Sequence, residues 1–62
     1  MEEKIKEAIS VMKKAFDTYN TNARRNLAVD NDEMYWYWRG IAEGTRMSWE
    51  LIEELFNIKE EI

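Results

Sequence analysis

Residues 34–56 read MYWYWRGIAEGTRMSWELIEELF, and their apolar pattern decides the fold. On an α-helix with about 100° per residue, the apolar and small side chains of this half spread over roughly 200° of the circumference. They are Met34, Tyr35, Tyr37, Trp38, Ile41, Ala42, Thr45, Ser48, Trp49, Leu51, Ile52, Leu55, Phe56 and Ile62. One short neighbour cannot cover so wide a face, so the sequence predicts a helix packed on two sides.

The first half of the chain predicts one of those neighbours. Ile5, Ile9, Met12, Phe16, Tyr19 and Ala23 follow a 4-3-4-3-4 spacing, which keeps them on one side of a helix. This stripe is narrow enough for a single partner helix. Residues 20–22 are poor helix formers and offer an alternative break, but the apolar spacing continues through them to Leu27.

Residues 29–33 are the best candidate for the turn between the two helices. Asp30 is expected to cap the second helix, with Glu33 three positions later in a loose variant of a capping box. With a turn near residue 30, position i lies opposite about 60−i, which places Phe16 beside Gly44 and Thr45.

Gly40 and Gly44 are the only glycines, and each costs about 1 kcal/mol relative to alanine inside a helix. They indicate either a close helix approach, with Phe16 or a tryptophan of another copy in the notch, or a break after Arg39 with Ser48 capping a third helix. The apolar residues keep phase across both glycines, which favours one continuous helix.

These features predict an all-α domain over residues 1–62: an antiparallel hairpin, with helices at about 2–28 and 31–61, that dimerises into a four-helix bundle. A chain of this length buries only about 60% of its unfolded surface. It contains no cysteine and no histidine, so association is the expected source of further stability. The predicted dimer core comprises Tyr35, Trp38, Ala42, Thr45, Trp49, Ile52 and Phe56.

The formal charge of −4 is divided unevenly along the chain. Residues 1–28 carry +2 and residues 29–62 carry −6, which argues against a nucleic-acid partner for the second half. It permits a basic protein partner or the first half of another copy. No apolar run is long enough to span a bilayer, so we expect a cytoplasmic protein with no membrane partner.

Little in the sequence indicates catalysis. The usual general bases, thiol nucleophiles and soft-metal ligands are missing with histidine and cysteine. A group of carboxylates could in principle hold a cation, but it is better interpreted as a solvated helix face: Glu50, Glu53, Glu54, Glu60 and Glu61. We therefore expect no enzyme, no catalytic residue, no cofactor and no metal.

Trp36 points to a possible protein-binding surface. It falls on the charged side of its helix, together with Gly40, and Met47 and Ile58 follow it at intervals of eleven residues, almost in line. Tryptophan with methionine is a pair that anchors protein interfaces, although isolated apolar side chains are also ordinary on surfaces. The predicted partner-binding set is Trp36, Gly40, Glu43, Met47, Glu50, Glu54 and Ile58.

The first half carries a modest basic strip made of Lys13, Lys14, Arg24 and Arg25. Two uses are open: a grip on RNA, or ion pairs with Glu50, Glu53 or Glu54 of a neighbour. A purely structural or designed bundle is a further alternative.

Two resemblances add to this interpretation. In architecture the chain resembles the Rop family of plasmid copy-number regulators, helical hairpins that dimerise and bind paired RNA loops, but no residue is carried over. Residues 35–55, YWYWRGIAEGTRMSWELIEEL, are similar to a run found in short proteins of phages and mobile elements. That similarity implies an accessory protein that acts by binding, for example an acidic inhibitor of a host nucleic-acid enzyme or defence complex in the host cytoplasm.

Overall fold

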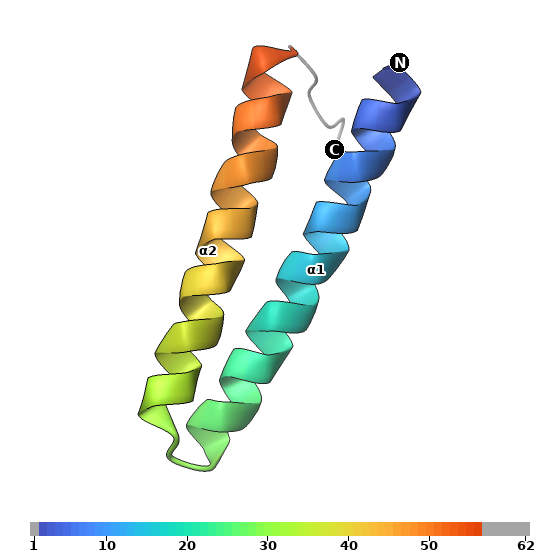
Figure 1. Ribbon diagram of the computed structural model, residues 1–62. Coiled ribbons are helices and arrows are strands. Elements are labelled where there is room, and N and C mark those ends of the chain that lie inside the picture. The colour runs from blue at the N-terminus through green and yellow to red at the C-terminus, as the bar shows by residue number, and fades with distance from the viewer. Residues whose placement is uncertain (1, 57–62) are drawn as a thin grey trace.

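The chain forms an antiparallel pair of helices in a computed structural model that describes residues 2–56. Helix α1 (Glu2–Ala28) and helix α2 (Asp32–Leu55) lie side by side and are joined by a short turn (Figure 1). The predicted all-helical hairpin is thereby confirmed. In sequence the second helix was expected to reach residue 61; α2 ends at Leu55, and residues 57–61 lie outside the described residues. Neither described helix combines the length and the apolar character needed to cross a membrane.

Helix α1 runs without a break through the polar residues 20–22. Two nearby hydroxyls donate hydrogen bonds to carbonyls of the preceding turn: Thr18 to Lys14 at 3.2 Å and Thr21 to Asp17 at 2.9 Å. Side chains bonded in this way remain compatible with a helix despite their low propensity. The alternative break in this region is therefore wrong.

The turn uses its two adjacent polar residues differently from the prediction. The backbone N–H of Asn31 donates to Asn26 (2.9 Å) and that of Asp30 to Leu27 (3.1 Å), the Schellman pattern that ends a helix. Asp30 supplies the left-handed residue of this motif, with φ 59°. Asn31 then caps α2, because its side-chain oxygen accepts from the N–H of Met34 at 3.2 Å. The predicted cap at Asp30 is wrong by one residue, since the chain must first reverse direction.

Helix α2 continues across both glycines, so the alternative third helix is wrong. The Ser48 hydroxyl donates to the carbonyl of Gly44 at 2.9 Å and caps nothing. Apart from the neighbouring backbone of α2, a Cβ built at Gly40 or Gly44 would meet no atom of the described residues within 4 Å. Phe16 therefore does not fill a notch there, and close approach inside the hairpin does not explain either glycine.

The core lies along the seam between the helices and is small. Four hydrophobic residues of the described chain are buried: Ile9, Ala23, Ala42 and Trp49. Phe16 packs edge-on against Trp49, with ring centroids 5.1 Å apart, a contact that the sequence register did not predict. Helical side chains lean toward their own N-terminus, so the long indole of Trp49 covers the level that Phe16 occupies.

Candidate interaction surfaces

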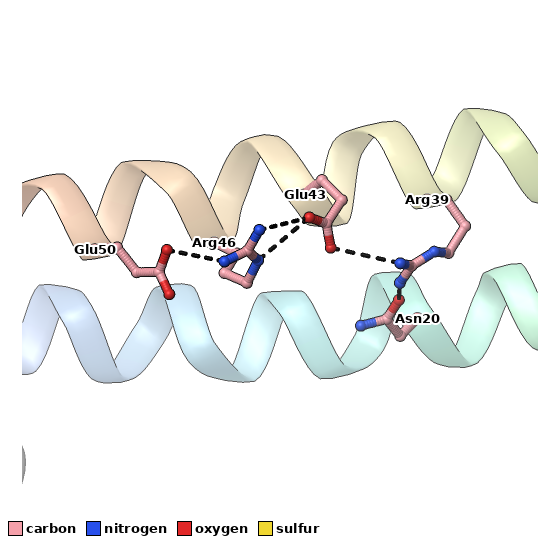
Figure 2. Close-up of polar contacts among 5 residues, drawn as sticks. All are labelled: Asn20, Arg39, Glu43, Arg46 and Glu50. Carbon is pink, nitrogen blue, oxygen red and sulfur yellow. Dashed lines mark hydrogen bonds and ion pairs between the residues drawn. The ribbon is translucent and has the colours of Figure 1, made fainter.

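One side of the hairpin is held by polar contacts, and we call it the polar face: Lys13, Asn20, Arg39, Glu43, Arg46, Glu50 and Glu53. Four of its residues follow one another along α2, where Arg46 bonds Glu43 at 2.8 Å and Glu50 at 2.9 Å (Figure 2). Arg39 reaches Glu43 at 3.5 Å and also donates across the seam to the side-chain oxygen of Asn20. The hydrogen bond between Arg39 and Asn20 ties α2 to α1 on this side, and the other contacts connect side chains along α2.

The pair of Glu43 and Arg46 shows how the network biases protonation. The hydrogen bond from Arg46 is the main cause that lowers the pKa of Glu43, and the same bond raises the pKa of Arg46. Both side chains are partly open to solvent, at 38% exposure each, so water screens the pair. The network therefore orients side chains more than it stabilises the fold.

An ion pair also crosses the seam on the polar face. The ammonium of Lys13 lies 3.7 Å from the Glu53 carboxylate and 5.9 Å from the centroid of the Trp49 ring. Lys13 was considered as a partner for acidic residues of a neighbour or for RNA. It is instead engaged within its own chain.

The opposite side of the hairpin is apolar. Residues seven apart lie nearly in line on a helix. Several such series lie on the side of the hairpin that carries the Tyr19–Trp38 ring stack. This side is opposite the Asn20–Arg39 contact. We call this surface the apolar face: Ile5, Ala8, Met12, Ala15 and Tyr19 on α1, with Tyr37, Ile41, Gly44, Ser48, Leu51 and Leu55 on α2. It continues the apolar arc of α2 beyond the part that α1 covers.

The apolar face is open to solvent in the single chain. Leu55 is 70% exposed, Tyr37 56% and Leu51 54%. Gly44 and Ser48 between them are exposed as well. Large apolar side chains this open on one side of a helix are typical of surfaces that another molecule contacts.

The predicted dimer core lies mostly along the seam, and none of its residues belongs to the apolar face. Ala42 and Trp49 are buried against α1, while Phe56 is 55% exposed. The remaining four are half-buried along the seam: Tyr35, Trp38, Thr45 and Ile52. The seam thus already uses part of the set that was assigned to a second copy.

The predicted partner surface lies on the outer edge of α2, which we define as Trp36, Gly40 and Met47. Trp36 is 68% exposed, Met47 is 63% exposed, and Gly40 is exposed between them. A groove of about 400 Å³ runs beside Met47, between Leu51 and the acidic side chains Glu50 and Glu54. The structure therefore brings these residues to one edge.

Two members of the predicted partner set behave differently. Glu43 is half-buried, because Arg39 and Arg46 hold its carboxylate within the polar face. Ile58 lies outside the described residues.

A shallow cleft of about 470 Å³ lies on the polar face near the turn, beside Phe16, Tyr35 and Arg24. Its lining also includes Arg39, whose guanidinium already bonds Asn20 and Glu43. Within residues 2–56 no cluster of three or more possible metal ligands occurs; Glu60 and Glu61 fall outside that range.

Sequence reasoning missed the role of Asn20. The sequence indicates only that Asn20 is a poor helix former, yet its side-chain oxygen accepts a hydrogen bond from Arg39 across the seam. One signal was present: Asn20 and Arg39 add to 59, so they fall at the same level of a hairpin that turns near residue 30.

Comparison of the chain with protein-family models, with curated proteins and with solved structures found no match. The interaction surfaces therefore have to be interpreted from their own chemistry.

Proposed function

We propose that this chain is a homodimeric protein-binding module, in which two hairpins cover each other's apolar face and form a four-helix bundle. The observation that carries the proposal is the imbalance of burial. Among the described residues, nine large hydrophobic side chains are at least half exposed, against four hydrophobic residues that are buried; three of the nine, Tyr37, Leu51 and Leu55, lie on the apolar face. Burying apolar area contributes roughly 25 cal/mol per Å², so covering this surface stabilises a chain whose own core is small.

In the proposed bundle Trp36, Gly40 and Met47 lie outside the apolar face and stay available for a second protein, which would meet the dimer interface where the groove beside Met47 is lined by Ser48 and Leu51. Trp36 and Met47 offer apolar anchors, and Glu50 and Glu54 beside them favour a partner with a basic contact surface. Nucleic-acid enzymes and defence complexes present such surfaces to their substrates. A compact acidic module that covered one would inhibit it, and we propose this role for the outer edge.

Light scattering of matched double variants tests the dimer. Tyr37→Lys with Leu55→Lys places two charges on the apolar face, and we expect it to reduce the mass from twice to once the 7.5 kDa of one chain. Trp36→Lys with Met47→Lys is the control, because it adds the same charge at residues that are equally exposed. We expect the control to remain dimeric. A wild-type mass of one chain at micromolar concentration would reject the proposal.

A further inference from the structure

The two helices carry opposite net charge, and this bears on how two copies fit together. The charged residues of α1 amount to +2 and those of α2 to −4. A two-fold dimer through the apolar face has two possible arrangements. Either both turns lie at one end and each α1 covers the partner's α2, or the turns lie at opposite ends and like helices face each other.

We infer that the second copy docks with both turns at the same end, so that α1 of each chain lies over α2 of the partner subunit. This inference rests on the proposed function. The arrangement pairs a +2 helix with a −4 helix twice, whereas the alternative places the two −4 helices together. Packed helix axes lie about 8–10 Å apart, close to the Debye length of about 8 Å at physiological salt, so this difference is partly screened there and is largest at low salt.

Side-chain sizes fit the same arrangement. A two-fold axis that runs along the bundle does not change the height of any residue along that axis. A residue of α1 therefore lies at the same height as the same α2 residue in its own chain and in the partner. The contact between Asn20 and Arg39 sets that level. Ala8 then lies between Leu51 of the partner subunit and Leu55 of the partner subunit, small against large.

The height of Gly44 along the bundle suggests a reason for this glycine that the contacts within one hairpin do not provide. By the sum of 59 that Asn20 and Arg39 give, Ala15 of α1 lies at the level of Gly44 of the partner subunit, while the ring of Tyr19 stays stacked on Trp38 of its own chain. Apart from the neighbouring backbone of α2, nothing within residues 2–56 lies within 4 Å of a Cβ built at Gly44. A small side chain opposite a glycine lets the backbones of two helices approach closely at this level.

The side of the hairpin that carries the apolar face has the dimensions of a standard interface. The Cα atoms of the chain extend 43 Å by 19 Å in their two longer directions, which gives a face of about 800 Å². That is the area each partner buries in an interface of standard size.

Distances between spin labels distinguish the two arrangements. The sequence has no cysteine, so Val29→Cys in the turn gives one label per chain at an exposed site. We expect a label-to-label distance below about 30 Å in the dimer, because both turns lie one helix spacing apart. Turns at opposite ends would give about 40 Å or more, close to the 43 Å length of the hairpin.

Glu3→Cys, at the other end of α1, gives an independent second site should the turn variant fold poorly. We expect a short distance there as well. Long distances at either site overturn the arrangement but keep the dimer and thus the proposed function. The absence of dipolar coupling for both labels, in samples that circular dichroism shows to be helical, would overturn the dimer and the arrangement together.

Discussion

At the scale of single residues, Asp30 and Asn31 are both suitable N-cap residues for α2, but they have different roles in the turn. Asp30 adopts the left-handed conformation, and Asn31 caps α2. Asp30→Gly should therefore raise the free energy of unfolding by up to about 1 kcal/mol, because glycine adopts this conformation without strain. Asn31→Ala should lower it by about 0.5–2 kcal/mol. Urea denaturation measures both, and a loss for Asp30→Gly would mean that Asp30 is the cap.

The Glu43–Arg46 contact predicts a dependence of stability on pH. Because the pKa of Glu43 is lowered in the folded chain, the pair stabilises the fold above the ordinary value of 4.5 and stops doing so as pH falls through the lower, folded value. Glu43→Gln should thus lose less of its thermal midpoint than wild type when pH drops from neutral to below 4.5. Glu54→Gln, on the same helix, is the control. Identical pH curves for Glu43→Gln and wild type would contradict this account.

At the scale of the helices, Gly40 and Gly44 lie on different surfaces of α2. Replacing Gly40 by alanine should raise the free energy of unfolding by about 0.5–1 kcal/mol through helix propensity alone, because the added Cβ meets nothing. Gly44→Ala gains the same propensity but puts a methyl group where we propose that a second copy packs, so its net gain should be smaller. Denaturation of both variants at micromolar concentration checks this difference. Equal gains would argue against a close contact at Gly44.

The sequence predicts the helices well and their local details poorly. Apolar spacing continues through residues 20–22 and across both glycines, and both helices continue there, because periodic burial outweighs weak local propensity. The position of a helix cap is harder to predict, because Asp30 and Asn31 are equally suitable N-cap residues. Only the geometry of the chain reversal determines which of them caps α2. The Phe16–Trp49 contact was missed for a related reason: residue levels ignore the lean of long side chains.

At the scale of the whole molecule, the sequence shows that α2 has more apolar surface than one helix can cover. It does not show which flank stays open, because that depends on where α1 settles. The cross-seam contacts of Lys13 with Glu53 and Arg39 with Asn20 place α1 and leave Tyr37 and Leu55 on the open side. The placement of Trp36 and Met47 on an outer edge was predictable, since it follows from helical phase alone.

The arrangement with oppositely charged helices in contact predicts a salt effect on the dimer. Raising the salt from about 0.05 M to about 1 M screens the attraction between α1 and the partner's α2, so the dissociation constant should rise. Sedimentation equilibrium at several salt concentrations measures it. Tighter association in high salt would instead indicate that like-charged helices face each other.

The central claim is that a second copy covers the apolar face, and the dependence of the thermal midpoint on protein concentration tests it most directly. A dimer that dissociates as it unfolds is stabilised by mass action, so Tm should rise steadily over a roughly hundredfold increase in concentration around the micromolar range. A cooperative transition at one fixed Tm across that range would contradict the claim, because it would mean that the single hairpin is stable with its apolar face exposed to water.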